Sequence, residues 1–256
     1  MTENVRAARS SEKTGAVHEI VEIIKTVVYA LLIALFLRVL LFQPFTIPSA
    51  SMEPNLLEGD YIIVSKYSYG YSHHSIPLSP PLFKGRIMER TPTRGDIIVF
   101  KLPSNTKIDY IKRLVGLPGD RIQVREGLLY INGRRVPREQ VGGEATDLDF
   151  HAVRQFRETF PNGRTFLTDD RGTDQDLDNT DVFVVPEGYY FFMGDNRDNS
   201  LDSRVPAPVG VGFVPAENLI GRAQIILLSW DPEASIFKPW TWFLNVRLDR
   251  FFHVLK

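Results

Sequence analysis

The stretch DRIQVREGLLYINGRRV, residues 120–136, is rich in β-branched residues and carries Asn132-Gly133 between two short runs. Asn-Gly is the pair that favours a two-residue β-hairpin turn, because both turn positions need positive φ. Comparable β-branched and aromatic runs, bounded by Gly, Pro, Asp or Asn, lie on both sides at 60–67, 95–102, 110–117, 181–195 and 220–230. No convincing amphipathic helix interrupts them beyond Pro44. The sequence therefore predicts a mainly β fold.

Two stretches break this pattern. Residues 68–91 are typical of an extended ribbon or loop, and the polar residues 137–180 of a solvated insertion. Within the insertion, the acidic run DDRGTDQDLDNTD at 169–181 lacks the spacing of a calcium-binding loop, so we expect a solvated loop rather than a metal site.

The composition excludes several function classes. The chain has 256 residues and 43% hydrophobic residues, enough for a real core, and its formal net charge of −1 gives no overall attraction to nucleic acid. It has no cysteine, which excludes thiol catalysis, disulfides and Cys-ligated zinc. Neither H-E-x-x-H nor G-x-S-x-G occurs among its motifs. His73 and His74 are expected on the surface rather than on a metal, and no histidine stands out for a Ser-His-Asp triad.

An apolar segment near the N-terminus predicts a membrane anchor. From Lys25 to Phe42 the chain has 18 residues, near the lower limit for crossing a hydrocarbon core of about 30 Å. The FQPFTIP that follows has no small-residue pair for cleavage of a secretory signal, and a buried core helix is the other alternative. The basic residues that precede the span favour a cytoplasmic N-terminus: Arg6, Arg9, Lys13 and Lys25.

The C-terminal segment FKPWTWFLNVRLDRFFHVLK mixes aromatic with basic residues. This composition suits a membrane interface, and packing of the aromatic side chains on the β core fits it equally well.

Two serines in IPSASMEP, residues 47–54, follow the anchor closely and are flanked by Pro48 and Pro54. A serine hydroxyl is a weak nucleophile until a base takes its proton. In DYIKRLVGLPGD, residues 109–120, a strand would place Tyr110 and Lys112 on one face and Ile111 and Arg113 on the other. Burial lowers the pKa of a lysine and lets the neutral amine act as a base, whereas a lysine whose amine reaches solvent would have no such role.

A third segment, GDNRDNSLDSR at 194–204, is too polar for a core strand. It could form a hydrogen-bonded network around a site, or an Asx-rich turn.

Together, IPSASMEPNLLEGD, RGDIIVF, YIKRLVGLPGD and GDNRDNSLDSR, in this order after a membrane span, resemble the blocks of bacterial type I signal peptidase. This family of Ser-Lys membrane proteases removes signal peptides from exported preproteins, and the resemblance covers the chain beyond residue 20. It implies a single-pass protein of the bacterial inner membrane, with its catalytic domain outside the cytoplasm. Signal peptides, membrane lipid and the secretion machinery are the implied partners, without nucleic acid, metal or other cofactor.

The resemblance also implies roles for matching residues. Ser51 matches the nucleophile and Lys112 the general base, while Ser49 matches the hydroxyl that helps the Ser51 backbone N–H to hold the oxyanion. Ser200 matches the serine that orients the lysine. Three charged residues match structural supports of the site: Asp195, Asp202 and Arg204.

The family's substrate pockets are shallow and apolar, which suits small side chains at −1 and −3 of a signal peptide. Their lining matches Phe45, Ile47, Pro48, Met52, Leu56, Ile62, Val99, Tyr110 and Ile111. The substrate would bind as an added strand near the lysine. Asn55 departs from the pattern, because threonine is common at its position.

The implied organisation is a cytoplasmic segment 1–19, a transmembrane helix 20–42, a catalytic core in two parts, 43–136 and 186–235, and a membrane-proximal segment 236–256. A smaller β cap would start near 121 and include the insertion 137–185. A specialised peptidase that matures one pilin or conjugation substrate is the main alternative. A Ser-Lys autoprotease of the repressor type would need a DNA-binding N-terminus, and an inactive signal-peptide-binding scaffold would not need Ser51, Lys112 and Ser200 together.

Overall fold

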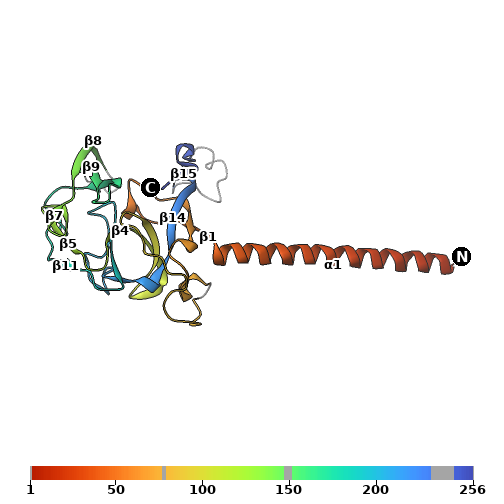
Figure 1. Ribbon diagram of the computed structural model, residues 1–256. Coiled ribbons are helices and arrows are strands. Elements are labelled where there is room, and N and C mark those ends of the chain that lie inside the picture. The colour runs from red at the N-terminus through yellow and green to blue at the C-terminus, as the bar shows by residue number, and fades with distance from the viewer. Residues whose placement is uncertain (1, 77–78, 147–151, 232–244, 256) are drawn as a thin grey trace. The chain divides into compact units, whose positions relative to one another are not determined.

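The computed structural model describes residues 2–76, 79–146, 152–231 and 245–255. The chain divides into two compact units, Met1–Leu41 and Phe42–Lys256, which are described separately. The first is a single helix and the second is built from β-strands (Figure 1). The prediction of a mainly β fold with an N-terminal apolar helix is confirmed.

The helix α1 runs from Thr2 to Leu40, so it begins well before the expected residue 20 and ends two residues before the expected residue 42. Within its segment His18–Leu40, the most apolar window of 18 residues has a mean hydropathy of 2.4, and none of that window is buried. Large apolar side chains such as Leu31 and Phe36 are more than half exposed. This exposure fits a segment whose side chains face lipid.

One large sheet forms the body of the second unit. Its strands follow the order β1-β2-β14-β3-β4-β12-β13, and β15 also pairs with β14. The bounds are β1 Phe42–Thr46, β2 Asp60–Ser65, β3 Ile97–Leu102, β4 Asn105–Gly116, β12 Tyr189–Met193, β13 Val214–Pro215, β14 Leu219–Ser229 and β15 His253–Val254. Short 3-10 turns η1 to η5 lie at Ala50–Met52, Lys66–Ser68, His73–Ser75, Ala216–Asn218 and Leu248–Arg250.

Two small sheets lie between β4 and β12 in the chain. The first has the order β11-β5-β6-β7, with β5 at Arg121–Arg125, β6 at Leu128–Ile131, β7 at Arg134–Arg135 and β11 at Phe183–Val184. The expected hairpin joins β6 to β7, where Asn132 (φ 53°) and Gly133 (φ 76°) provide the two positive-φ positions. The second has the order β10-β9-β8, with β8 at Arg138–Thr146, β9 at Ala152–Thr159 and β10 at Thr165–Asp170.

The second small sheet corrects the expectation of a solvated insertion at 137–180. The buried face of β10 carries Phe166, Thr168 and Asp170, so two of its three inward residues are polar and the usual apolar alternation is missing from the sequence. Asp170 and Asp178 of the acidic run are buried, whereas Asp174 and Asp176 are exposed as expected.

The 68–91 segment is also more compact at its start than an extended ribbon. It carries η3 and an isolated bridge that joins Tyr71 to Ile87. His74 is buried there, contrary to the expected surface position, and burial lowers its pKa to about 4. A neutral imidazole can be buried at lower cost than a charged one.

At the C-terminal end, Trp240, Trp242 and Phe243 lie outside the described residues. The described part packs on the large sheet: β15 pairs with β14, and Arg250 forms an ion pair with the buried Asp60 at 2.5 Å. Phe252 nevertheless remains 66% exposed. Among residues 245–255, some side chains thus pack on the β core and others are exposed.

Candidate active site

Ser51 is the middle residue of the 3-10 turn η1. This turn begins directly after Ser49, whose backbone is extended (φ −149°, ψ 152°). Met52 and Leu56, on either side of Pro54, are 1% and 0% exposed in the core under the sheet. Burial of each such side chain contributes about 1.5–3 kcal/mol, so two apolar anchors hold the turn that carries Ser51.

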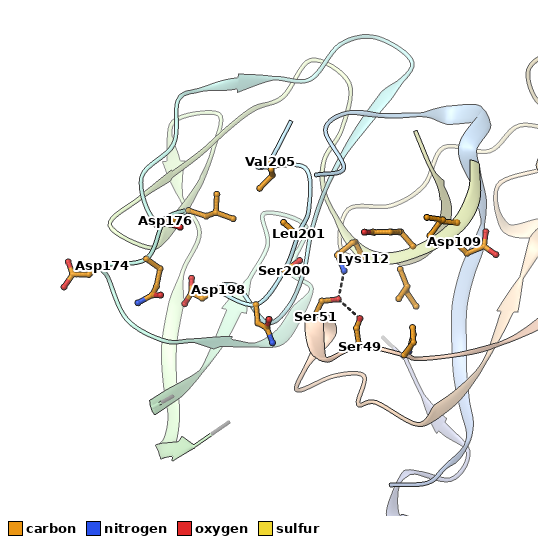
Figure 2. Close-up of a pocket in the computed structure, with 17 residues that line it drawn as sticks. Ser49, Ser51, Asp109, Lys112, Asp174, Asp176, Asp198, Ser200, Leu201 and Val205 are labelled. Carbon is orange, nitrogen blue, oxygen red and sulfur yellow. Dashed lines mark hydrogen bonds between the residues drawn. The ribbon is translucent and has the colours of Figure 1, made fainter. Parts of the chain in front are cut away.

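Lys112 lies on β4 opposite Ile98 of β3 and is 4% exposed. Its Nζ donates to Ser51 Oγ at 2.5 Å, as Figure 2 shows. Burial lowers the pKa of Lys112 to about 8; the charges of Asp202 and Asp195 oppose this shift and that of Arg204 adds to it. A lysine of this kind holds a usable fraction of neutral amine near neutral pH, and that amine can accept the proton of the serine hydroxyl.

The hydroxyls of Ser49 and Ser51 lie 3.3 Å apart (Figure 2). A hydroxyl beside the nucleophile can rotate to donate to negative charge that develops there. The structure thus brings Ser49, Ser51 and Lys112 together from two segments separated by about 60 residues of sequence.

The segment 194–204 passes close to the backbone of Ser51. A Cβ added at Gly194 would overlap both Ser200 Oγ and the Ser51 carbonyl oxygen, so only glycine permits this close approach. Ser200 is 7% exposed and its hydroxyl has no hydrogen-bond partner among the described residues. It faces the groove that also contains Lys112 (Figure 2).

Two buried ion pairs lie behind these groups. Asp202 accepts from Arg204 Nε and Nη2 at 2.9 and 2.8 Å, and it also accepts from the Gly194 N–H at 3.0 Å. These contacts hold the pKa of Asp202 below its usual value against the opposing effect of burial. Asp195 pairs instead with Arg113, through Nε and Nη2 at 2.7 Å each. Arg113 follows Lys112 directly, and sequence reasoning assigned it only to the opposite face.

Two asparagines near Ser51 were also missed. The Asn55 side chain reaches Asp195, and the Asn196 backbone N–H donates to the Ser51 carbonyl oxygen at 3.2 Å. In the sequence, Asn55 was identified only as a departure from a family pattern. Its structural role could not be predicted, because its hydrogen-bond partners lie more than 100 residues away in the chain.

Ser49, Ser51 and Lys112 line a groove of about 750 Å³. One side carries Ile108, Asp109, Tyr110 and Ile111 of β4, with Pro48. The other side carries the loops with Asp174, Gln175, Asp176, Leu177, Asp198, Asn199, Leu201 and Val205. Figure 2 shows the acidic side chains on the side of Ser51 away from Asp109, and burial raises the pKa of Asp198 to about 6.

Of the nine residues expected to bind substrate, Pro48, Tyr110 and Ile111 line this groove. The rest form the apolar cluster under the sheet, where Ile111 also packs: Phe45, Ile47, Met52, Leu56, Ile62 and Val99. Six of the nine thus belong to the buried core and do not line the groove.

One edge of β4 is open beside Lys112. Strand β3 pairs with β4 over Asn105–Arg113, whereas β12 pairs only with Arg113, Leu114 and Gly116. Within the described residues, the edge from Asn105 to Lys112 therefore has no strand partner on the groove side, so an extended peptide can add there.

Comparison with known proteins gives a consistent result. Residues 20–230 match the family described as signal peptidase, peptidase S26. The chain is 45% identical to signal peptidase I of Rickettsia felis, over 89% of this chain and 90% of that protein. It is 45% identical to signal peptidase I of Rickettsia canadensis, over 90% of this chain and 92% of that protein. A crystal structure of a signal peptidase I from Enterococcus faecalis is 29% identical, with a TM-score of 0.30, over 52% of this chain and 97% of that one.

Proposed function

Because the chain belongs to the signal peptidase family, peptidase S26, we propose that it cleaves its substrates with Ser51 as nucleophile and Lys112 as general base. The family removes signal peptides from exported preproteins, and the chain is a type I signal peptidase with an apolar N-terminal helix that suits a membrane anchor. The alternative of a peptidase for one pilin or conjugation substrate is not favoured, because curated relatives matching about 90% of the chain are signal peptidases I.

One observation carries the assignment of the residues. The Lys112 amine lies 2.5 Å from the Ser51 hydroxyl in a buried environment that lowers the lysine pKa to about 8. In the neutral state this amine takes the hydroxyl proton as Ser51 Oγ attacks the carbonyl carbon at the cleavage site. The Ser51 backbone N–H and the Ser49 hydroxyl would then hold the oxyanion.

The remaining steps return every group to its starting state. The tetrahedral intermediate collapses, the C–N bond breaks, and the new amine of the mature protein leaves with the proton from Lys112. The neutral lysine next takes a proton from water, which attacks the acyl-enzyme and releases the signal peptide as a carboxylic acid. Lys112 finally returns that proton to Ser51 Oγ as the ester bond breaks.

The substrate would lie extended along the open edge of β4, with its small −1 and −3 side chains toward Pro48 and Ile111, which line the groove. The support for this placement is the edge of β4 from Asn105 to Lys112, which has no strand partner among the described residues on the side away from β3.

Purified full-length enzyme in detergent tests the pair. Ser51→Ala and Lys112→Ala should each abolish cleavage of a preprotein, and the double variant should lose little more, because members of one catalytic unit are not additive. Lys66→Met is the matched control: Lys66 is also buried and donates to the Ser75 carbonyl oxygen at 2.6 Å, but it does not line the groove. Retained cleavage in Lys112→Ala, with loss on changing a histidine, would contradict the proposal.

We also propose that the N-terminus is cytoplasmic and the β unit lies outside the cytoplasm, since basic residues precede the span. Protease added to spheroplasts should then digest the β unit. Digestion of the β unit only after the membrane is permeabilised would show that the orientation is the opposite one.

A further inference from the structure

Asn55, four residues after Ser51, connects the catalytic turn to two other parts of the protein. Its Nδ2 donates to the Leu167 carbonyl oxygen of β10 at 2.7 Å and to Asp195 Oδ2 at 2.8 Å. A side-chain amide has two N–H donors, so both are used. The catalytic turn is thereby tied to the second small sheet and to the buried acid of the 194–204 segment.

Asp195 continues the connection to the strand that carries the base. Its two carboxylate oxygens accept from Arg113, which is next to Lys112 on β4, and both side chains are at most 2% exposed. A two-point contact of this type fixes the relative orientation of guanidinium and carboxylate. Asn55, Asp195 and Arg113 thus form one chain of contacts from the loop of Ser51 to the strand of Lys112.

Strand β10 supports the nucleophile from a second direction. The Asp169 N–H donates to the Asp195 carbonyl oxygen at 2.9 Å, and Asp169 also forms a parallel bridge with Asn196. The Asn196 N–H in turn donates to the Ser51 carbonyl oxygen at 3.2 Å. The end of β10 therefore reaches the catalytic turn through Asn55 on one side and through Asn196 on the other.

We propose that Asn55 is a positioning residue, which keeps Ser51 within reach of Lys112 by joining the catalytic turn to β10 and to the Asp195–Arg113 pair. This inference rests on the proposed roles of Ser51 and Lys112. It assigns to the small β10-β9-β8 sheet a part in catalysis, since that sheet supplies the Leu167 carbonyl to which Asn55 is bound. Asn55 does not line the groove, so it acts through Ser51 and Lys112 rather than on the substrate.

Asn55→Ala removes both bonds, whereas Asn55→Thr supplies a single hydroxyl donor and can make one of them. Misplacement of reacting groups by about 1 Å can cost on the order of 100-fold in rate. We therefore expect Asn55→Ala to lower kcat by about 10-fold to 100-fold with KM changed less than about twofold, since the groove keeps its lining. Asn55→Thr should give an intermediate kcat.

Asn218→Ala is the matched control. The Asn218 side chain is buried, whereas Asn55 is half-buried, and like Asn55 it donates to a backbone carbonyl, that of Lys101, at 2.8 Å, but Asn218 does not line the groove. Its loss should lower the Tm by an amount comparable to Asn55→Ala and leave kcat near that of the native enzyme. The measurement is kcat, KM and Tm for the native chain and the three variants, with one preprotein in detergent.

A kcat that falls in both Asn55 variants, in the order Ala below Thr below native, with Asn218→Ala unaffected, supports the proposal. Equal kcat losses in Asn55→Ala and Asn218→Ala that follow Tm would make Asn55 merely structural, and native kcat in Asn55→Ala would overturn the idea outright. If Asn55→Ala does not fold, Asn55→Thr decides: its kcat must fall below native. All values are relative to the native enzyme, so failure here leaves the results for Ser51→Ala and Lys112→Ala untouched.

Discussion

The pH dependence of cleavage follows from the burial of Lys112. With a pKa of about 8, about one molecule in ten has a neutral lysine at pH 7, against about one in 3000 for a lysine at 10.5. Burial therefore raises the fraction of active base by about 300-fold. Because only the neutral amine accepts the serine proton, kcat/KM should rise tenfold per pH unit below the pKa and level off above it.

The assay is kcat/KM on a preprotein in detergent from about pH 6 to about pH 10, since this ratio reports the ionisations of the free enzyme. Asp198 lines the groove and has a pKa raised to about 6, so the data above pH 7 isolate Lys112. A break near 8 is expected. A rate that still rises at about pH 10 would mean an unperturbed lysine, and a break near 6.5 would point to histidine; either result refutes the reasoning.

Three further changes test neighbouring parts of the site. Lys112→Met should abolish cleavage yet raise the free energy of unfolding at pH 7, by up to roughly 3 kcal/mol, because the folded native chain must bury an ammonium there. The pKa of Lys112 is lower in the folded than in the unfolded chain, so the free energy of unfolding of the native protein rises between pH 8 and 10.5. The stability advantage of Lys112→Met, measured by urea unfolding, should therefore shrink over that range. An advantage that does not depend on pH would contradict the burial argument. We propose that the buried Ser200 hydroxyl, which lines the same groove as Lys112, orients the Lys112 amine during the reaction; Ser200→Ala should then lower kcat with a modest change in KM, and native kcat would remove Ser200 from that role. Gly194→Ala should lower kcat by about 100-fold, since its Cβ would displace the Ser51 carbonyl or the Ser200 side chain, and near-native turnover would show that the segment can move away at no cost.

Local sequence patterns were enough to predict much of the fold. Asn132-Gly133 predicted its hairpin because a two-residue turn depends on those two residues alone. The β-branched runs at 60–67 and 220–230 likewise became β2 and β14. Strand β10 escaped notice because its buried face holds Thr168 and Asp170, whose burial is balanced by contacts from elsewhere, such as that of Arg138 with Asp170 at 2.5 Å.

For the site, recognition of four ordered sequence blocks placed Ser51 and Lys112, and the structure brings their side chains together. The sequence could not pair the supporting charges. Asp195 joins Arg113 across 82 positions, and Asn55 reaches Asp195 across 140, so no local pattern links them. His74 was misplaced for a related reason: its burial comes from the fold of the 68–91 segment, which carries no apolar period.

The unpaired edge of β4 has a consequence for which polypeptides the enzyme can attack at all. An edge strand binds a peptide first through backbone hydrogen bonds, whatever the peptide's side chains. Only an extended peptide can present N–H and C=O groups that match those of the strand. On the proposed mode of binding, a small residue at −1 inside a folded helix or a paired strand could not bind at this site, however well its side chain would fit. The backbone conformation of a polypeptide would then limit cleavage before its sequence does. Chains that are unfolded around the cleavage site would be cleaved, and folded proteins with the same residues would not.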